Sequence, residues 1–313
     1  MIAKHLKEMP NNYIQDYIKA GKGVIAAKKL AKRIIAPGET FLEIANLCEA
    51  EVINNECELA FPINISLNEI AAHYSPLIDD QTIVPEKGLL KIDIGAHYNG
   101  YIADSAFTIN IDEDPKLQVY IEAAKEALDA AIQLFAPGTK LYELGEAIAQ
   151  KIINFGLKPI VNLGGHEMKR FDLHAGLFIP NYKEKLHNQE LKPGDAYACE
   201  PFATSGVGKV ENGNNWYILR FIKKIKKNMP YEYLSYINKI EKHFKHLPFS
   251  PRWIEKQNFI PKNKIQRSID FLLGKKVLDK YYILIEKTKE PVAQEEHTII
   301  LDTDGNRIVT TQD

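Results

Sequence analysis

The chain repeats its own plan once, with a spacing of about one hundred residues. In each copy a helix is expected to end at a Pro-Gly stop, and a second helix follows at once. Proline cannot continue the helical hydrogen-bond ladder, and glycine tolerates the left-handed conformation that closes a helix. The repeat therefore predicts two similar helix pairs, which carry YIKA at 17–20, APG at 36–38 and FLEI at 41–44, then YIEA at 120–123, APG at 136–138 and LYEL at 141–144.

The repeat extends into the strands that follow. Each helix pair is followed by a β-rich run, at 59–65 and at 159–163. A turn containing Pro and Gly then leads into a strand that carries Asp93 in the first copy and ends on Glu200 in the second. Two copies are too few for a solenoid. We therefore expect an α+β fold in which one duplicated unit packs about a pseudo-twofold axis, with the two halves of the sheet meeting at a central site.

Residues 89–111 are expected to form a β-hairpin, because Asn99-Gly100 is the strongest short signal for a two-residue hairpin turn. With that turn Asp93 opposes Ala106, and Asp104 lies two residues from Ala106 on the same strand. Side chains alternate between faces with a period of two. Asp93 and Asp104 should therefore point to one face as diagonal neighbours, about 7–8 Å apart at the backbone.

Two buried carboxylates on one face need a compensating positive charge. The hairpin contains no arginine, and Lys91 reaches the face of Asp93 only at one edge. A structural ion-pair cluster is the alternative, but a divalent cation accounts better for this composition.

The second half should supply a matching pair of strands. Its first strand ends on Glu200, and its best partner strand lies much later, at 292–300. The halves match only if a segment is inserted between about Gly208 and Pro291. Alternation lets one of Glu295 and Glu296 face the site, and the pattern alone leaves open which one.

Three histidines, His73, His166 and His174, lie in segments of unusual composition, one of them after Gly164-Gly165. Neutral imidazole beside carboxylates is a usual ligand mixture for Zn, Mn, Fe or Co. Four others are interpreted as surface or structural residues, His97, His187, His243 and His246.

Taken together, these segments resemble the pita-bread metallopeptidases, and closely the type II methionine aminopeptidases in their short archaeal form. That resemblance implies a curved antiparallel sheet and a site for two divalent metal ions, Co, Mn, Fe or Zn. In the matching segment the glutamate directly before His-Thr is the ligand, which favours Glu296 over Glu295. The implied metal ligands are Asp93, Asp104, His166, Glu200 and Glu296.

The same resemblance implies roles around these ligands. Asp104 and Glu296 would bridge the metals, and a metal-bridged water would attack the peptide with Glu200 as its proton shuttle. His174 would donate to the developing oxyanion, and His73 would contact the first residue and the scissile amide. An apolar aromatic slot suits the thioether of an N-terminal methionine, and its expected residues are Phe61, Leu173 and Tyr281.

Between the halves the composition changes and resembles the winged-helix-like insertion of type II enzymes. We expect a catalytic domain at 1–207 and 291–313, and an inserted subdomain at 208–290 with helices at 231–244 and 261–273. The insertion carries the basic run KKIKK at 223–227. This run is either an ordinary solvated face or a contact with the ribosome.

The expected activity is removal of methionine from nascent polypeptides whose second residue is small. The enzymatic rival is a prolidase or aminopeptidase P, although those enzymes carry an extra N-terminal domain and here the repeat begins by Tyr17. A non-catalytic relative that binds RNA or the ribosome is the other alternative. A net charge of −1, three cysteines in no metal or redox spacing and no long apolar run predict a cytoplasmic protein without a membrane partner. We also expect a monomer.

Overall fold

The computed structural model describes residues 13–223 and 229–312, and it shows the two predicted helix pairs. The first helices of the two pairs end at Ile34 and Leu134, shortly before the Pro-Gly stops, and Gly38 and Gly138 adopt positive φ, at 92° and 87°, in the turns that follow. This confirms that the two Pro-Gly stops end those helices. The pairs and their following strands are α2 (Tyr13–Ile34), α3 (Phe41–Asn54) and β1 (Glu58–Leu59), then α4 (Pro115–Leu134), α5 (Leu141–Asn154) and β6 (Lys158–Pro159).

The first helix of each pair begins earlier than its repeated sequence motif suggested. Helix α4 begins at Pro115 because Asp114 accepts a hydrogen bond from the amide of Lys116 at 2.9 Å. Proline at the first helical position costs no hydrogen bond, because that amide has no partner within the helix. The motif at 120–123 therefore lies inside the helix rather than at its start.

The first half of the sheet contains the predicted hairpin. Its strands pair in the expected register, with Asp93 opposite Ala106 and Tyr98 opposite Tyr101. Helix α2 packs on both strands, and the first helix pair and these strands share one apolar core. The four strands of this sheet are β1, β2 (Asn64–Leu67), β4 (Leu89–Tyr98) and β5 (Tyr101–Asn110).

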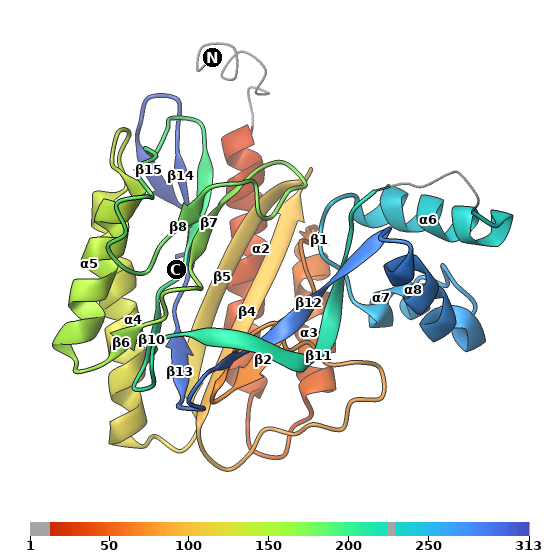
Figure 1. Cartoon of the computed structure of the whole chain (residues 1–313), viewed down its shortest axis with the longest axis horizontal. Helices are drawn as coiled ribbons and strands as arrows, with labels where there is room; N and C mark the ends of the chain where they lie inside the picture. Colours follow the sequence, from red (N-terminus) through yellow and green to blue (C-terminus); the bar gives the residue numbers. More distant parts are fainter. Residues whose placement is uncertain (1–12, 224–228, 313) are drawn as a thin grey trace.

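The second half forms its central pairing from strands far apart in the sequence. In the pair β9–β14, Cys199 lies opposite His297, and in the pair β10–β13, Phe202 lies opposite Gln294. The other helix pair covers these strands around a separate core (Figure 1). The strands are β7 (Gly165–Met168), β8 (Phe178–Ile179), β9 (Ala196–Cys199), β10 (Phe202–Thr204), β13 (Val292–Gln294), β14 (His297–Leu301) and β15 (Arg307–Val309).

The two halves meet along β5 and β14. The Thr298 hydroxyl accepts from the amide of Asp104 at 2.7 Å and donates to the carbonyl of Asp104 at 2.8 Å. The amide of Glu296 donates to the carbonyl of Ala106 at 3.1 Å. This junction confirms the expected α+β arrangement, in which two similar halves meet at a centre.

The described residues of the segment between the halves form two strands and three α-helices. Strands β11 (Val210–Phe221) and β12 (Leu278–Glu286) pair with β3 (Ile70–Ala72). A separate apolar core lies under α6 (Tyr231–Phe244), α7 (Pro251–Lys256) and α8 (Ile265–Gly274), which occupy one end of the molecule in Figure 1.

The helices of this segment agree in part with expectation. Helix α6 has the predicted bounds. Helix α8 begins later than predicted, at Ile265, because residues 262–264 form a 3₁₀ turn, and α7 was not predicted. The domain boundaries at 207–208 and 290–291 stay a prediction. Residues 224–227 of the basic run lie outside the described residues. No helix among the described residues is long and apolar enough to span a bilayer.

Candidate metal centre and substrate pocket

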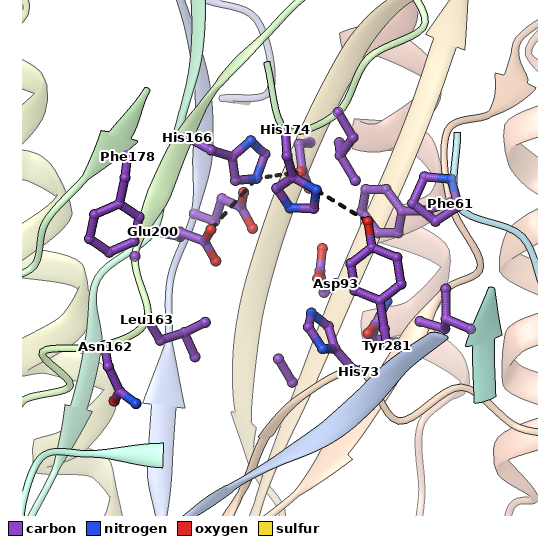
Figure 2. A pocket seen from close by; sticks show the side chains of 18 residues that line it. Phe61, His73, Asp93, Asn162, Leu163, His166, His174, Phe178, Glu200 and Tyr281 are labelled. Carbon is purple, nitrogen blue, oxygen red and sulfur yellow. Dashed lines mark hydrogen bonds and ion pairs between the residues drawn. The ribbon is translucent and has the colours of Figure 1, made fainter. Parts of the chain in front are cut away.

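A cavity of about 230 Å³ opens where the two halves and the insertion meet (Figure 2). Every residue that the sequence suggested for metal binding, catalysis or the apolar slot lines this cavity. The expected lining residues are Phe61, His73, Asp93, Asp104, His166, Leu173, His174, Glu200, Tyr281 and Glu296.

The aspartates come from the first half. Asp104 lies opposite Gly95 in the β4–β5 register, so Asp93 and Asp104 are diagonal neighbours on one face, as predicted. Burial raises the pKa of Asp93 to about 7. Burial, followed by the charges of Glu296 and Asp93, raises the pKa of Asp104 well above its usual range. Both carboxylates are therefore costly to ionise without a nearby cation.

The glutamates come from the second half, where both strands are interrupted. Glu200 and Glu296 lie between the paired positions of β9–β14 and β10–β13, so they face each other across the break. The carboxylate of Glu295 instead accepts from the amide of Thr108 at 3.2 Å, and it does not line the cavity. The choice that the sequence pattern left open is thereby decided in favour of Glu296.

His166 projects from β7 toward these carboxylates. Its Nε2 lies 3.6 Å from Oδ2 of Asp104 and 3.7 Å from Oε1 of Glu200. These separations are too long for good hydrogen bonds but allow the groups to share an ion. Burial lowers the pKa of His166 to about 4, so the ring is neutral and can coordinate. One ligand atom from each of Asp104, His166 and Glu296 lies within 4.8 Å of the other two.

The donor set fits divalent cations. Oδ1 of Asp93, Oδ1 of Asp104 and Oε1 of Glu296 are buried without a hydrogen-bond partner among the described residues. Burial and neighbouring carboxylates also raise the pKa of Glu200 and Glu296 well above the usual range. Buried polar atoms normally have partners, and a cation would satisfy these atoms and their charge together.

Gln294 is a site residue that the sequence interpretation missed. Its Nε2 donates to Oε2 of Glu200 at 3.2 Å and lies 3.4 Å from Oε2 of Glu296. The amide therefore orients both glutamates from the side. Strand alternation was the available signal, because Gln294 lies two residues before Glu296 and so shares its face.

The buried lysines nearest the centre have different roles. Lys91, the one cation that the sequence placed near Asp93, donates to the carbonyls of Asn68 and Val292. Lys28 of α2, which was not foreseen, donates to the Ser105 hydroxyl at 2.7 Å, and that hydroxyl donates to the carbonyl of Glu296 at 2.6 Å. Lys28 therefore supports the ligand strands from behind.

The outer histidines border the cavity without belonging to the carboxylate cluster. His73 has a positive φ of 69°, and its Nδ1 lies 3.0 Å from the carbonyl oxygen of Tyr282. Burial lowers its pKa, which keeps the ring neutral. The His174 ring lies 4.4 Å from the ring of His166, and its Nδ1 is 3.4 Å from the Tyr281 hydroxyl. Figure 2 shows both histidines directed into the cavity.

The apolar part of the cavity has a wall from each half and one from the insertion. Phe61 and Leu173 are buried, and Phe61 packs so closely on Gly95 that a Cβ there would collide with its ring. Two insertion residues, Ile218 and Pro248, also line the cavity and were not foreseen. Their signal was weak in sequence, because neither belongs to a segment with polar side chains of obvious chemistry.

Comparisons with known proteins agree with this geometry. Residues 16–225 match the model of metallopeptidase family M24. The methionine aminopeptidase of Methanothermobacter thermautotrophicus is 37% identical over 298 residues, which are 95% of this chain and 98% of that protein. The methionine aminopeptidase of Pyrococcus abyssi is 39% identical over 301 residues, which are 96% of this chain and 99% of that protein.

A solved structure described as a thermophilic Arx1 has the same fold. It superimposes with a TM-score of 0.83 and covers 96% of this chain and 91% of its own, at 15% identity. At that identity the similarity concerns the fold alone.

Proposed function

The chain belongs to metallopeptidase family M24, with methionine aminopeptidases similar to it over nearly their whole length, and from this membership we propose how its cavity works. The protein is a metal-dependent hydrolase that removes N-terminal methionine. The observation that carries the proposed mechanism is the convergence of four carboxylates, three of them buried and one half-buried, and a neutral histidine beside an apolar slot.

We assign two divalent ions, Co, Mn, Fe or Zn, to this cluster. The residues that would hold them are Asp93, Asp104, His166, Glu200 and Glu296, with Asp104 and Glu296 shared between the two ions. Divalent ions in such a site lower the pKa of water and polarise a carbonyl. The buried carboxylate oxygens that have no hydrogen-bond partner in the described part of the chain support this assignment.

The surrounding side chains would move protons and steady charge. Glu200 would accept the proton of the attacking water as a general base and pass it to the leaving amine as a general acid. Gln294 holds Glu200 in position through its amide. His174 donates to the scissile carbonyl oxygen as negative charge develops on it. His73 contacts the first residue and the scissile amide from the opposite wall.

The slot explains the choice of substrate. Phe61, Leu173 and Tyr281 offer an apolar, aromatic surface for a flexible thioether. His73 and His174 restrict the space beside the scissile bond, so the second residue of the substrate should be small. The partner is therefore the exposed N-terminus of a nascent polypeptide.

Hydrolysis of Met-Ala-Ser tests this function. Enzyme stripped with EDTA should be inactive and should regain activity with Co, Mn, Fe or Zn. Met-Leu-Ser should be a poor substrate. Full activity in protein shown by elemental analysis to be metal-free would contradict the proposal, and a preference for Xaa-Pro peptides with other first residues would favour a prolidase-like enzyme.

We further propose that the enzyme is a cytoplasmic monomer whose insertion contacts the ribosome through its basic face. Exposed Lys239 and Lys242 of α6 lie in the same insertion as the basic run at 223–227. Lysines near phosphate release counterions, so binding should weaken with salt. Replacing Lys223, Lys224, Lys226 and Lys227 with glutamine should reduce cosedimentation with ribosomes and leave tripeptide cleavage intact. Unchanged cosedimentation would make this run an ordinary solvated face.

A further inference from the structure

One buried ion pair joins the insertion to the first helix pair. Arg252 of α7 donates from Nη1 to Oε2 and from Nη2 to Oε1 of Glu49 in α3, both at 2.7 Å. Both side chains are almost fully buried, with exposures of 3% and 1%. Bidentate Arg–carboxylate geometry fixes the direction as well as the distance between two elements.

Three further hydrogen bonds are made around the pair. Nε of Arg252 donates to the carbonyl of Pro76 at 3.1 Å, and Nη1 also donates to the side chain of Asn46 at 3.0 Å. Nε1 of Trp253 donates to Glu49 at 3.0 Å. Glu49 thus holds two consecutive residues of the insertion, which leaves α7 little freedom to slide or rotate on α3.

A short, tightly bonded path leads from this pair to the substrate cavity. The Ser250 side chain caps α7 by accepting from the amide of Arg252. Phe249 and Leu219 exchange two backbone hydrogen bonds of 2.8 Å. The residues next to them, Pro248 and Ile218, line the cavity. Only three residues separate Arg252 from Pro248 in the sequence.

We propose that Glu49 and Arg252 are a positioning pair that sets the insertion wall of the methionine slot, and so controls selectivity for the first residue of the substrate. This inference rests on the proposed function. Neither residue lines the substrate cavity, so they act through Pro248 and Ile218.

The energetics of the pair favour positioning over plain stabilisation. Removing two charges from water is expensive, and a buried ion pair is often no more stable than apolar residues of the same volume. Such a pair does, however, permit one relative orientation of the elements that carry it. A wall made of two apolar side chains needs that precision, because a fit that differs by one methylene group in an apolar pocket is worth about 10–200-fold in discrimination.

The test compares Glu49→Gln with a control that destabilises the same insertion elsewhere. The glutamine substitution keeps the size of the side chain but removes the charge that holds Arg252. Ile269→Ala removes a fully buried side chain of α8 from the apolar core of the insertion and leaves both members of the ion pair in place. Metal-loaded wild type and both variants are assayed below their unfolding temperatures with Met-Ala-Ser and Leu-Ala-Ser. Metal content and Tm are measured for each.

For Glu49→Gln we expect KM for Met-Ala-Ser to rise on the order of tenfold with kcat changed less than about threefold, and the preference for Met over Leu to fall. Metal content should stay at the wild-type level. Ile269→Ala should lower Tm while leaving KM and the Met/Leu ratio unchanged.

Two results would overturn the proposal. One is a Glu49→Gln enzyme with wild-type KM and Met/Leu ratio, whatever its Tm, because the pair would then be a structural link only. The other is an equal rise in KM for Ile269→Ala, which would reflect general loosening of the insertion. If Glu49→Gln fails to fold, Arg252→Lys provides the same measurement. Failure of the wild type to cleave Met-Ala-Ser would refute the proposed function instead.

Discussion

The two halves of the molecule present carboxylates to one centre by different means. In the first half, β4 and β5 are continuous strands joined by a tight turn, and their aspartates are diagonal neighbours. In the second half, the paired strands are broken at the glutamates, and the chain between them contains the whole insertion. A duplicated unit can therefore keep its ligands in equivalent places even when its paired strands are far apart in the sequence.

The difference also extends to the residues that support each carboxylate pair. Gln294 precedes Glu296 by two positions and orients both glutamates. The residue two positions before Asp104 is Ile102, which is buried and has no polar atoms in its side chain. Each glutamate has one more rotatable bond than an aspartate, and the Gln294 amide reaches both glutamates.

The largest expected effect on activity comes from replacing Glu296, and the neighbouring Glu295 provides the control. Glu296→Gln should abolish turnover of Met-Ala-Ser, because it removes one of the proposed shared ligands, and Asp104→Ala should do the same from the first half. Glu295→Gln should retain activity, because its carboxylate bonds the amide of Thr108 outside the cavity. Elemental analysis with kcat measurements checks this, and equal losses in the Glu295 and Glu296 variants would contradict the assignment.

Variants of the two outer histidines should distinguish metal ligands from catalytic groups. His174→Ala should lower kcat by about 10²–10³, the usual cost of losing one donor to a developing oxyanion. Metal stoichiometry should stay near that of wild type for His174→Ala and His73→Ala, since neither ring belongs to the carboxylate cluster. Loss of metal in either variant would mean that the replaced histidine contributes to metal binding.

Gln294→Leu should have a smaller effect on metal affinity and activity, because Gln294 acts on the two glutamates of the second half. Partners of metal ligands typically contribute 10–100-fold in metal affinity or activity. We expect a loss within about that range, measured by metal titration followed by activity. Ile102→Val, a small change at the corresponding position of the first half, should leave metal affinity unchanged. Similar losses in both variants would mean that packing, not the amide, is what matters.

The smallest effect is a pH dependence of stability. The pKa of Asp93 is raised to about 7 by burial, whereas an unfolded aspartate has a pKa of about 3.9. Between these values the folded metal-free protein binds more protons than the unfolded chain, so its stability should fall as pH rises through this window. Metal needs the ionised carboxylate, so the Tm gained from metal should be a few degrees larger at about pH 7 than at about pH 5. Equal gains in Tm at both pH values would contradict the raised pKa of Asp93.

The features that could be predicted from sequence were those that depend on local sequence patterns. The Asn99-Gly100 turn fixed the strand register and therefore the relation of Asp93 to Asp104. Alternation alone could not choose between Glu295 and Glu296, because it places the two side chains on opposite faces without indicating which face is that of the site. Lys28 escaped notice because it reaches Ser105 from a helix remote in sequence.

The insertion shows a second limit of sequence patterns. Helix α6 has a long amphipathic pattern and was predicted with its observed bounds. Helix α7 is too short to show a period, and its position depends on the buried bond from Arg252 to Glu49. Tertiary contacts of this kind carry no local signature, so Pro248 could not be placed at the cavity from the sequence.

The break in the second half also determines when the site can exist during synthesis. The β4–β5 hairpin is local and can form as soon as its residues have left the ribosome. The strand containing Cys199 must wait for His297, after the insertion has been made. Pairings over such distances form late and slowly, because the intervening chain must first be ordered. The metal centre is therefore completed at the end of translation, and a growing chain lacks Glu296 until then.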